Sequence, residues 1–79
     1  MFITKTSDGR NNLCGKRVAF LRSSMGISQR ELADRLQIIG LDIDKNAIQR
    51  IEAGKRFVTD IELKALSNVF NISIDDLLS

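Results

Sequence analysis

The sequence predicts an all-α fold made of five helices. Four helix starts are marked along the 79 residues, each by a Ser, Thr or Asp residue that can cap the helix. At each start, the apolar residue before the cap can pack against an apolar residue in the first turn, as in a hydrophobic staple. Glycine or asparagine follows each of the first four helical stretches, and proline is absent. No segment alternates polar and apolar residues over the length of a strand. We therefore expect helices and no sheet.

The first two helices are expected over residues 16–25 and 29–38. Gly26 suits the end of the first, because glycine readily adopts the left-handed conformation that closes a helix. Ser28 and Glu31 have the spacing of a capping box, in which each side chain accepts a hydrogen bond from the backbone N–H of the other residue. This pair predicts that the second helix starts directly after Ser28.

The other three helices are expected over residues 45–53, 60–70 and 74–78. Each follows a residue whose side-chain oxygen can accept a hydrogen bond from the first turn: Asp44, Thr59 with Glu62, and Ser73 with the weaker partner Asp76. Apolar residues at helical spacing predict a single core: Val18, Leu21, Ile27, Leu32, Ala33, Leu36, Ile48, Ile51, Ile61, Leu63, Leu66, Val69, Phe70, Ile72, Ile74 and Leu77.

Composition narrows the class of protein. The chain has one cysteine, Cys14, and no histidine, which excludes an intrachain disulfide, most zinc and iron sites and histidine-based catalysis. No apolar run is long enough to span a bilayer or to act as a secretory signal. We expect a cytoplasmic protein that is not an enzyme and that uses no metal or cofactor. Cys14 is expected to be a small apolar filler rather than a redox sensor.

The length allows one domain, with the polar residues 1–12 as a tail or loosely docked arm and residues 13–79 as the folded body. The net charge is only +2, but residues 15–30 carry +4 and residues 45–56 carry +3, and an acidic stretch follows each. If the two basic stretches meet in space, one face of the molecule suits a polyanion. Otherwise the charges form a mixed, solvated surface.

The expected third helix has one side suited to reading DNA bases. At 100° per residue, Ile48 and Ile51 point to the core, and the opposite side carries Lys45, Asn46, Gln49, Arg50 and Ala53. Arginine can make a bidentate contact with guanine, and asparagine or glutamine can do so with adenine. A helix of about nine residues is ~14 Å long and fits a major groove ~12 Å wide. A solvated polar helix face is the alternative interpretation.

Three ordered runs of residues resemble the Cro/C1-type (XRE-like) helix-turn-helix family. They are Gly15-Lys16-Arg17-Val18-x-x-Leu21-Arg22, Gly26-Ile27-Ser28-Gln29-x-x-Leu32-Ala33 and Ile48-x-x-Ile51-Glu52-x-Gly54-Lys55-Arg56. The similarity continues from Thr59 to Leu78 and so covers about residues 13–78. It implies a compact, five-helix, lambda-repressor-like DNA-binding domain in which the second and third helices form the helix-turn-helix.

The resemblance also implies roles for particular residues. Those matching base contacts are Lys45, Asn46, Gln49 and Arg50. Those matching contacts with backbone phosphates are Arg17, Ser28, Gln29, Lys55 and Arg56. Arg22 and Glu52 match a pair that forms a salt bridge between the first and third helices in several relatives, and Arg22 could be shared between Glu52 and a phosphate.

The turn between the second and third helices is longer than in the common family pattern. Its extra residues, 38–43, are too apolar for a bare loop. We expect the second helix to run longer, with Leu41 and Ile43 packed against the core.

The aromatic residues are a second departure from the family pattern. Phe20 and Phe57 stand where the family usually has polar residues, and Phe2 lies in the tail. They either pack the arm, form a dimer contact, or are single apolar residues at the surface, which are common. Leu77 and Leu78 are further candidates for a dimer contact.

The predicted function is a sequence-specific DNA-binding transcription regulator. A small repressor of this kind would act by occupying its operator as a homodimer. We expect it on the nucleoid in the cytoplasm, with no membrane as a partner. The alternatives are the antitoxin component of a toxin–antitoxin pair and a protein-interaction module on the same fold, each with a protein partner; a carboxylate enzyme has no motif in support. Gln29, Arg50, Lys55 and Arg56, at DNA-facing positions, favour double-stranded DNA as the ligand.

Overall fold

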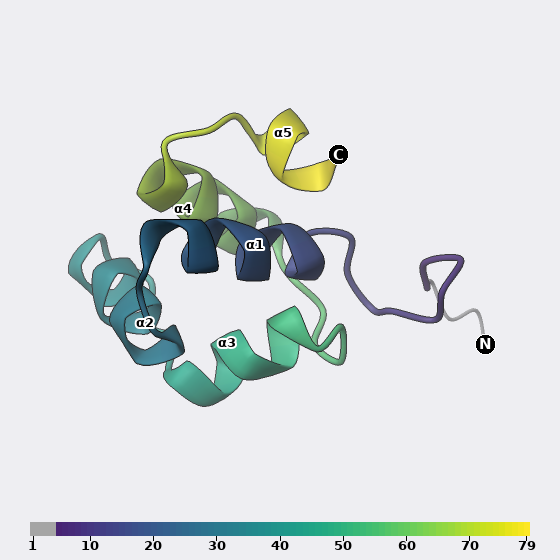
Figure 1. Ribbon diagram of the computed structural model, residues 1–79, viewed down its shortest axis with the longest axis horizontal. Helices are drawn as coiled ribbons and strands as arrows, with labels where there is room; N and C mark the ends of the chain where they lie inside the picture. Colours follow the sequence, from purple (N-terminus) through teal and green to yellow (C-terminus); the bar gives the residue numbers. More distant parts are fainter. Residues whose placement is uncertain (1–4) are drawn as a thin grey trace.

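The computed structural model describes residues 5–79, and in this range it contains helices and no strand (Figure 1). The helices are α1 (Gly15–Met25), α2 (Gln29–Ile38), α3 (Lys45–Glu52), α4 (Asp60–Phe70) and α5 (Ile74–Leu78). The all-α, five-helix prediction is confirmed. α1 begins one residue before its predicted start and α3 ends one residue before its predicted end. None of the helices described is long and apolar enough to cross a membrane.

The helix ends agree because the expected caps form. Both predicted capping boxes are complete, and the side chains of Asp44 and Ser73 each accept a hydrogen bond from the first turn of their helix. Gly26 and Asn71 close α1 and α4 in the left-handed conformation, with φ of 70° and 55°. α1 differs from the other helices, because its N-cap residue, Cys14, makes no side-chain cap bond.

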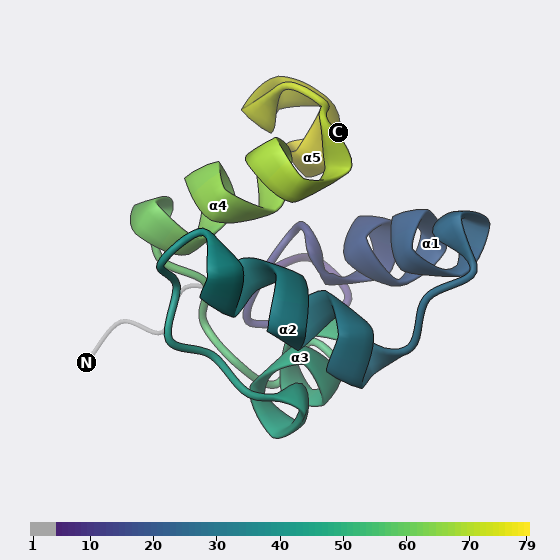
Figure 2. The same ribbon diagram turned by 90° about the vertical axis from the view of Figure 1, so that its left-hand side faces the viewer.

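α1 packs against both α3 and α5 (Figure 1). α3 and α5 lie on opposite sides of it. α2 packs across α3 and also contacts α4 (Figure 2). The helix-turn-helix pair is therefore joined to the rest of the core through α2. The segment before α1 leaves the bundle near the C-terminal end of α3.

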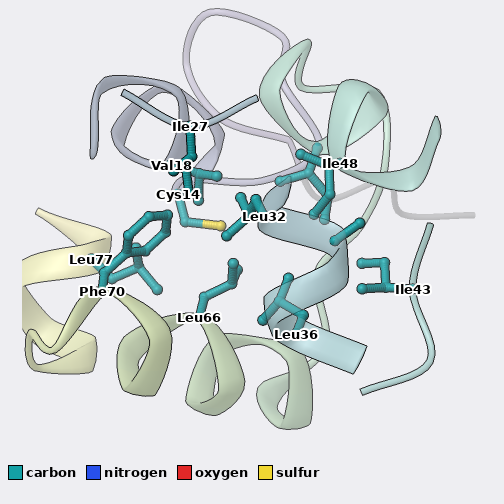
Figure 3. Packing of buried hydrophobic residues seen from close by; sticks show 12 residues of the cluster. Cys14, Val18, Ile27, Leu32, Leu36, Ile43, Ile48, Leu66, Phe70 and Leu77 are labelled. Atoms are coloured by element: carbon teal, nitrogen blue, oxygen red, sulfur yellow. The ribbon is translucent and has the colours of Figure 1, made fainter. Parts of the chain in front are cut away.

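Apolar side chains from all five helices meet in one core (Figure 3). The residues with at most 1% of their surface exposed are Cys14, Val18, Leu32, Leu36, Ile48, Ile51, Leu66 and Leu77. Four other predicted core residues are half-buried against this cluster: Leu21, Leu63, Val69 and Ile72. Burial raises the pKa of the Cys14 thiol to about 11, which fits the predicted role of an apolar filler.

Three predictions about apolar residues are wrong. Ile61 is 71% exposed, because α4 turns the sides carrying Leu66 and Phe70 inward and leaves Ile61 facing outward. Ile74 is 38% exposed, since the short α5 buries Leu77 instead. For the same reason Leu77 cannot form a dimer contact, because its side chain is fully enclosed by its own chain.

The long turn between α2 and α3 is divided between core and surface. Ile43 is 4% exposed, and its carbonyl accepts a hydrogen bond of 2.7 Å from the side chain of Gln37. Leu41 is half-buried against the core. The prediction for these two apolar residues is therefore confirmed. Ile38 and Ile39, by contrast, face solvent at the end of α2.

Candidate nucleic-acid interface

The outward side of α3 is polar and exposed. Ile48 and Ile51 are completely buried, which fixes the rotation of α3 against the core. The exposed residues on its other side are Lys45, Asn46, Gln49 and Arg50. Asp44 fixes the start of the helix, because its carboxylate accepts a hydrogen bond of 2.9 Å from the N–H of Ala47. The residues predicted to contact bases thus share one surface.

Glu52, the last residue of α3, connects three segments of the chain. Its carboxylate accepts hydrogen bonds from Nε and Nη2 of Arg22, at 2.7 and 3.1 Å, and from the amide of Gln29 at 3.1 Å. Arg22 also donates to the carbonyl of Ile27 at 2.9 Å. The ion pair between α1 and α3 is therefore present, and the hydrogen-bonded carboxylate raises the pKa of Arg22. This network fixes α1, α2 and α3 relative to one another.

Ser28 and Gln29 lie at the start of α2, next to α3. The Ser28 hydroxyl accepts a hydrogen bond of 3.0 Å from the N–H of Glu31, so it caps the helix. The Gln29 amide nitrogen donates a hydrogen bond to the Glu52 carboxylate. Both residues predicted to contact phosphate therefore also hold the helix-turn-helix together.

The two basic residues that follow α3 have different surroundings. Lys55 is exposed, and its backbone N–H donates to the carbonyl of Arg50 at 2.9 Å. Arg56 instead donates to the Glu62 carboxylate at 2.9 Å, and only 29% of its side chain is exposed. The hydrogen bond with Glu62 raises the pKa of Arg56. Burial raises the pKa of Glu62, but hydrogen bonds from Arg56 and from the Thr59 backbone outweigh it and leave this pKa below its ordinary value.

Arg17 lies on α1, next to Phe20. Its guanidinium carbon is 5.8 Å from the centre of the Phe20 ring, and it borders a shallow hollow shared with Phe20 and Ser79. Phe20 is 61% exposed there, whereas Phe57 borders a different hollow, beside the arm. Phe2 lies outside the residues that the structure describes.

Residues 10–12, expected to be loosely docked at most, are bound to the end of α3. Arg10 Nη2 donates to the carbonyl of Glu52 at 2.7 Å. Asn11 donates through its backbone to the carbonyl of Gly54 at 2.8 Å and through its side chain to that of Lys55 at 3.0 Å. The last carbonyls of a helix have no partner within the helix, so Arg10 satisfies one that α3 leaves free, and Asn11 binds the loop that follows. We call residues 10–12 the clasp.

Asn12 is the buried centre of the clasp, with 8% of its surface exposed. Its amide nitrogen donates to the carbonyls of Ile51 and Arg56, at 3.1 and 2.7 Å. Its amide oxygen accepts from the N–H of Gly15 at 2.8 Å, so it caps α1. A Cβ atom on Gly15 would collide with the Ile51 carbonyl oxygen. The start of α1 and the end of α3 therefore meet backbone to backbone.

Sequence reasoning missed the clasp. Asn11 and Asn12 stand just before a helix, where asparagine is common as a local cap or in a turn. Their partners lie 39–44 residues away along the chain, and no local pattern indicates contacts of that range. The glycine at position 15 is the one signal, because close backbone approach requires that residue.

Comparisons with known proteins agree with this arrangement. A helix-turn-helix family, HTH_3, matches residues 19–77. The restriction-modification controller protein C.AhdI from Aeromonas hydrophila is 27% identical in sequence, with a TM-score of 0.69 over 80% of this chain and 84% of that chain. A search of the curated proteins finds no match.

Two further solved structures share the fold at 20% identity. The clp gene regulator ClgR from C. glutamicum aligns with a TM-score of 0.72 over 86% of this chain and 82% of that chain. The DNA-binding domain of BldD aligns with a TM-score of 0.72 over 94% of this chain and 100% of that chain. With most of its length matched by the family and its helix-turn-helix complete, the chain belongs to the Cro/C1-type helix-turn-helix family of DNA-binding transcription regulators.

Proposed function

We propose that this protein binds specific sites in double-stranded DNA with α3 in the major groove and represses transcription by occupying them. The observation that carries the proposal is the outward side of α3, where exposed amide, ammonium and guanidinium groups stand on a helix whose other side is completely buried. A helix of this length is ~12 Å long, which matches a major groove ~12 Å wide. Base contacts are assigned to Lys45, Asn46, Gln49 and Arg50.

The phosphate contacts are assigned to residues that flank α3. Ser28 and Gln29 stand at the start of α2, where Gln29 binds the last residue of α3, and Lys55 follows α3 in the chain. Arg56 contributes through a guanidinium that Glu62 already holds. Arg17, on α1 beside Phe20, is assigned a phosphate contact from outside the helix-turn-helix.

We propose that two copies bind one pseudo-palindromic site. One small module gives limited affinity and specificity, and a second copy doubles the groove contacts. Exposed apolar side chains that a second copy could cover are Leu13, Phe20 and Phe57, each at least 60% exposed. The names of C.AhdI, a controller protein, and ClgR, a gene regulator, support a regulatory role.

Selection of DNA from a genomic fragment library tests the proposal. Fragments retained by the purified protein are sequenced at about 0.05 and 0.2 M salt, because non-specific phosphate contacts weaken steeply over this range. Arg50→Ala serves as the specificity control. We expect a palindromic motif that survives the higher salt and that loses definition at one base pair per half-site with Arg50→Ala. Retention that disappears at higher salt without a motif would instead favour a protein partner, as in an antitoxin or an interaction module.

A further inference from the structure

An open hollow of about 630 Å³ lies between the N-terminal segment and the end of α3. Lysines from three separate parts of the chain line it: Lys5 from the N-terminal segment, Lys16 from the first turn of α1 and Lys55 from the loop after α3. Lys55 has been assigned to a backbone phosphate above, but no assigned role accounts for Lys5 and Lys16 beside it. We propose that the hollow binds one phosphate of the DNA backbone, next to the groove that α3 enters. The inference rests on the proposed function and extends it to residues outside the helix-turn-helix.

The charge of the hollow favours an anion. Arg10 adds a fourth cationic side chain to the lining, and Asp8 is the acidic residue there. Asp8 is already engaged, because it accepts a hydrogen bond from Thr6 and pairs with Lys16 at 2.9 Å. The lining therefore carries a charge of +3 from four cations and one anion. Like charges held together repel one another, and a bound phosphate relieves that repulsion.

The clasp removes the obstacle that a helix C-terminus normally presents to an anion. The free carbonyls of a last turn carry partial negative charge and repel phosphate. Here Arg10, Asn11 and Asn12 donate to the carbonyls of this turn and of the loop that follows. Donor groups therefore cover the negative end of α3, and the guanidinium of Arg10 lies directly over Gly54.

The position of the hollow connects it to the DNA-reading side of α3. Ala53 lies four residues after Gln49, which places it on the same side of the helix, and it also lines the hollow. Two of the lining residues, Gly9 and Ala53, are small and exposed. Figure 1 shows the N-terminal segment alongside the C-terminal end of α3. A strand bordering the major groove would thus pass from the outward side of α3 into the hollow.

Binding of a random-sequence duplex measures this site without knowledge of the operator. The dissociation constant is determined by fluorescence anisotropy of labelled DNA across a salt series for the parent, Lys5→Gln, Lys55→Gln and the double variant. Lys64→Gln is the matched control, because Lys64 lies on α4 next to Ile61, away from the clasp. The release of counterions from one phosphate contributes about eightfold to affinity at ~0.1 M salt and about 0.9 to the salt slope.

We expect Lys5→Gln and Lys55→Gln each to lose several-fold in affinity. The double variant should lose about eightfold, rather than the product of two full contacts, because both lysines hold the same phosphate. Lys5→Arg should bind as the parent does. Thermal unfolding followed by circular dichroism checks that every variant remains folded to the same temperature.

The proposal is overturned if Lys5→Gln binds as tightly as Lys64→Gln, or if the losses of the two single variants multiply in the double variant. Both results require a parent that binds the duplex with an affinity that falls as salt rises. If the parent itself shows no salt-dependent binding, the proposed function fails first, and the two failures are thereby distinguished.

Discussion

Replacing Asn12 by alanine tests the contact that joins the N-terminal segment to α3. The substitution removes three hydrogen bonds: two donated to Ile51 and Arg56, and one accepted from Gly15. At about 1 kcal/mol each they contribute about 3 kcal/mol to the free energy of unfolding. A chain of this length is stable by only about 4–12 kcal/mol, so the loss is a large part of the total. At about 5 °C per kcal/mol, we expect the melting temperature to fall by about 15 °C.

Far-ultraviolet circular dichroism in urea is the suitable assay, because the chain contains no tryptophan or tyrosine to follow by fluorescence. Asn46→Ala is the matched control: it truncates the same residue type at an exposed position of α3 and should change stability by less than about 0.5 kcal/mol. Asn12→Asp should be at least as damaging as Asn12→Ala at neutral pH, since a carboxylate would face two carbonyl oxygens. If Asn12→Ala unfolds at the same urea concentration as Asn46→Ala, the reasoning about the clasp is refuted.

Three other predictions follow from the side chains described above. Because the pKa of Glu62 is lowered in the folded protein, its contribution to stability is complete above the unfolded value near 4.5 and is lost as the pH falls below it. Urea titrations between about pH 3 and 7 should therefore show less acid destabilisation for Glu62→Gln than for the parent, and equal acid slopes for the two would contradict this. Since burial raises the pKa of the Cys14 thiol to about 11, a thiol reagent at about pH 8 should label it only when the fold opens, and faster in Asn12→Ala; immediate labelling of the native parent would count against its burial. Arg50→Ala should weaken specific DNA binding by about 1–3 kcal/mol and relax preference at one base pair, which competition with operator variants would measure; unchanged discrimination would remove Arg50 from the base-reading set.

The helices could be predicted from the sequence because their signals are local. The cap Ser28 and its partner Glu31 lie within one helical turn of each other. The buried and exposed residues that define the two sides of α3 are also close together in the sequence. Once the side of a helix that faces the core is identified, a rotation of 100° per residue predicts which way every other side chain points. That identification is less certain on α4, where Ile61 precedes several other apolar residues and faces outward.

The candidate site was less predictable than the helices, because its polar groups form hydrogen bonds with partners far along the chain. Gln29 and Arg56 have the chemistry of phosphate ligands, but their carboxylate partners, Glu52 and Glu62, become visible only in three dimensions. The same holds for Asn12, whose amide has several common local uses. Sequence reasoning thus places side chains on a surface but does not show which of them the fold already employs.

The two sides of α3 have separate evolutionary consequences. Stability depends on Ile48, Ile51 and Glu52, whereas recognition is assigned to exposed residues that contribute little to the core. Descendants of this chain can therefore exchange the outward residues and acquire new binding sequences without approaching the threshold of unfolding. After gene duplication, two copies could diverge to control different genes through a few substitutions on one side of one helix.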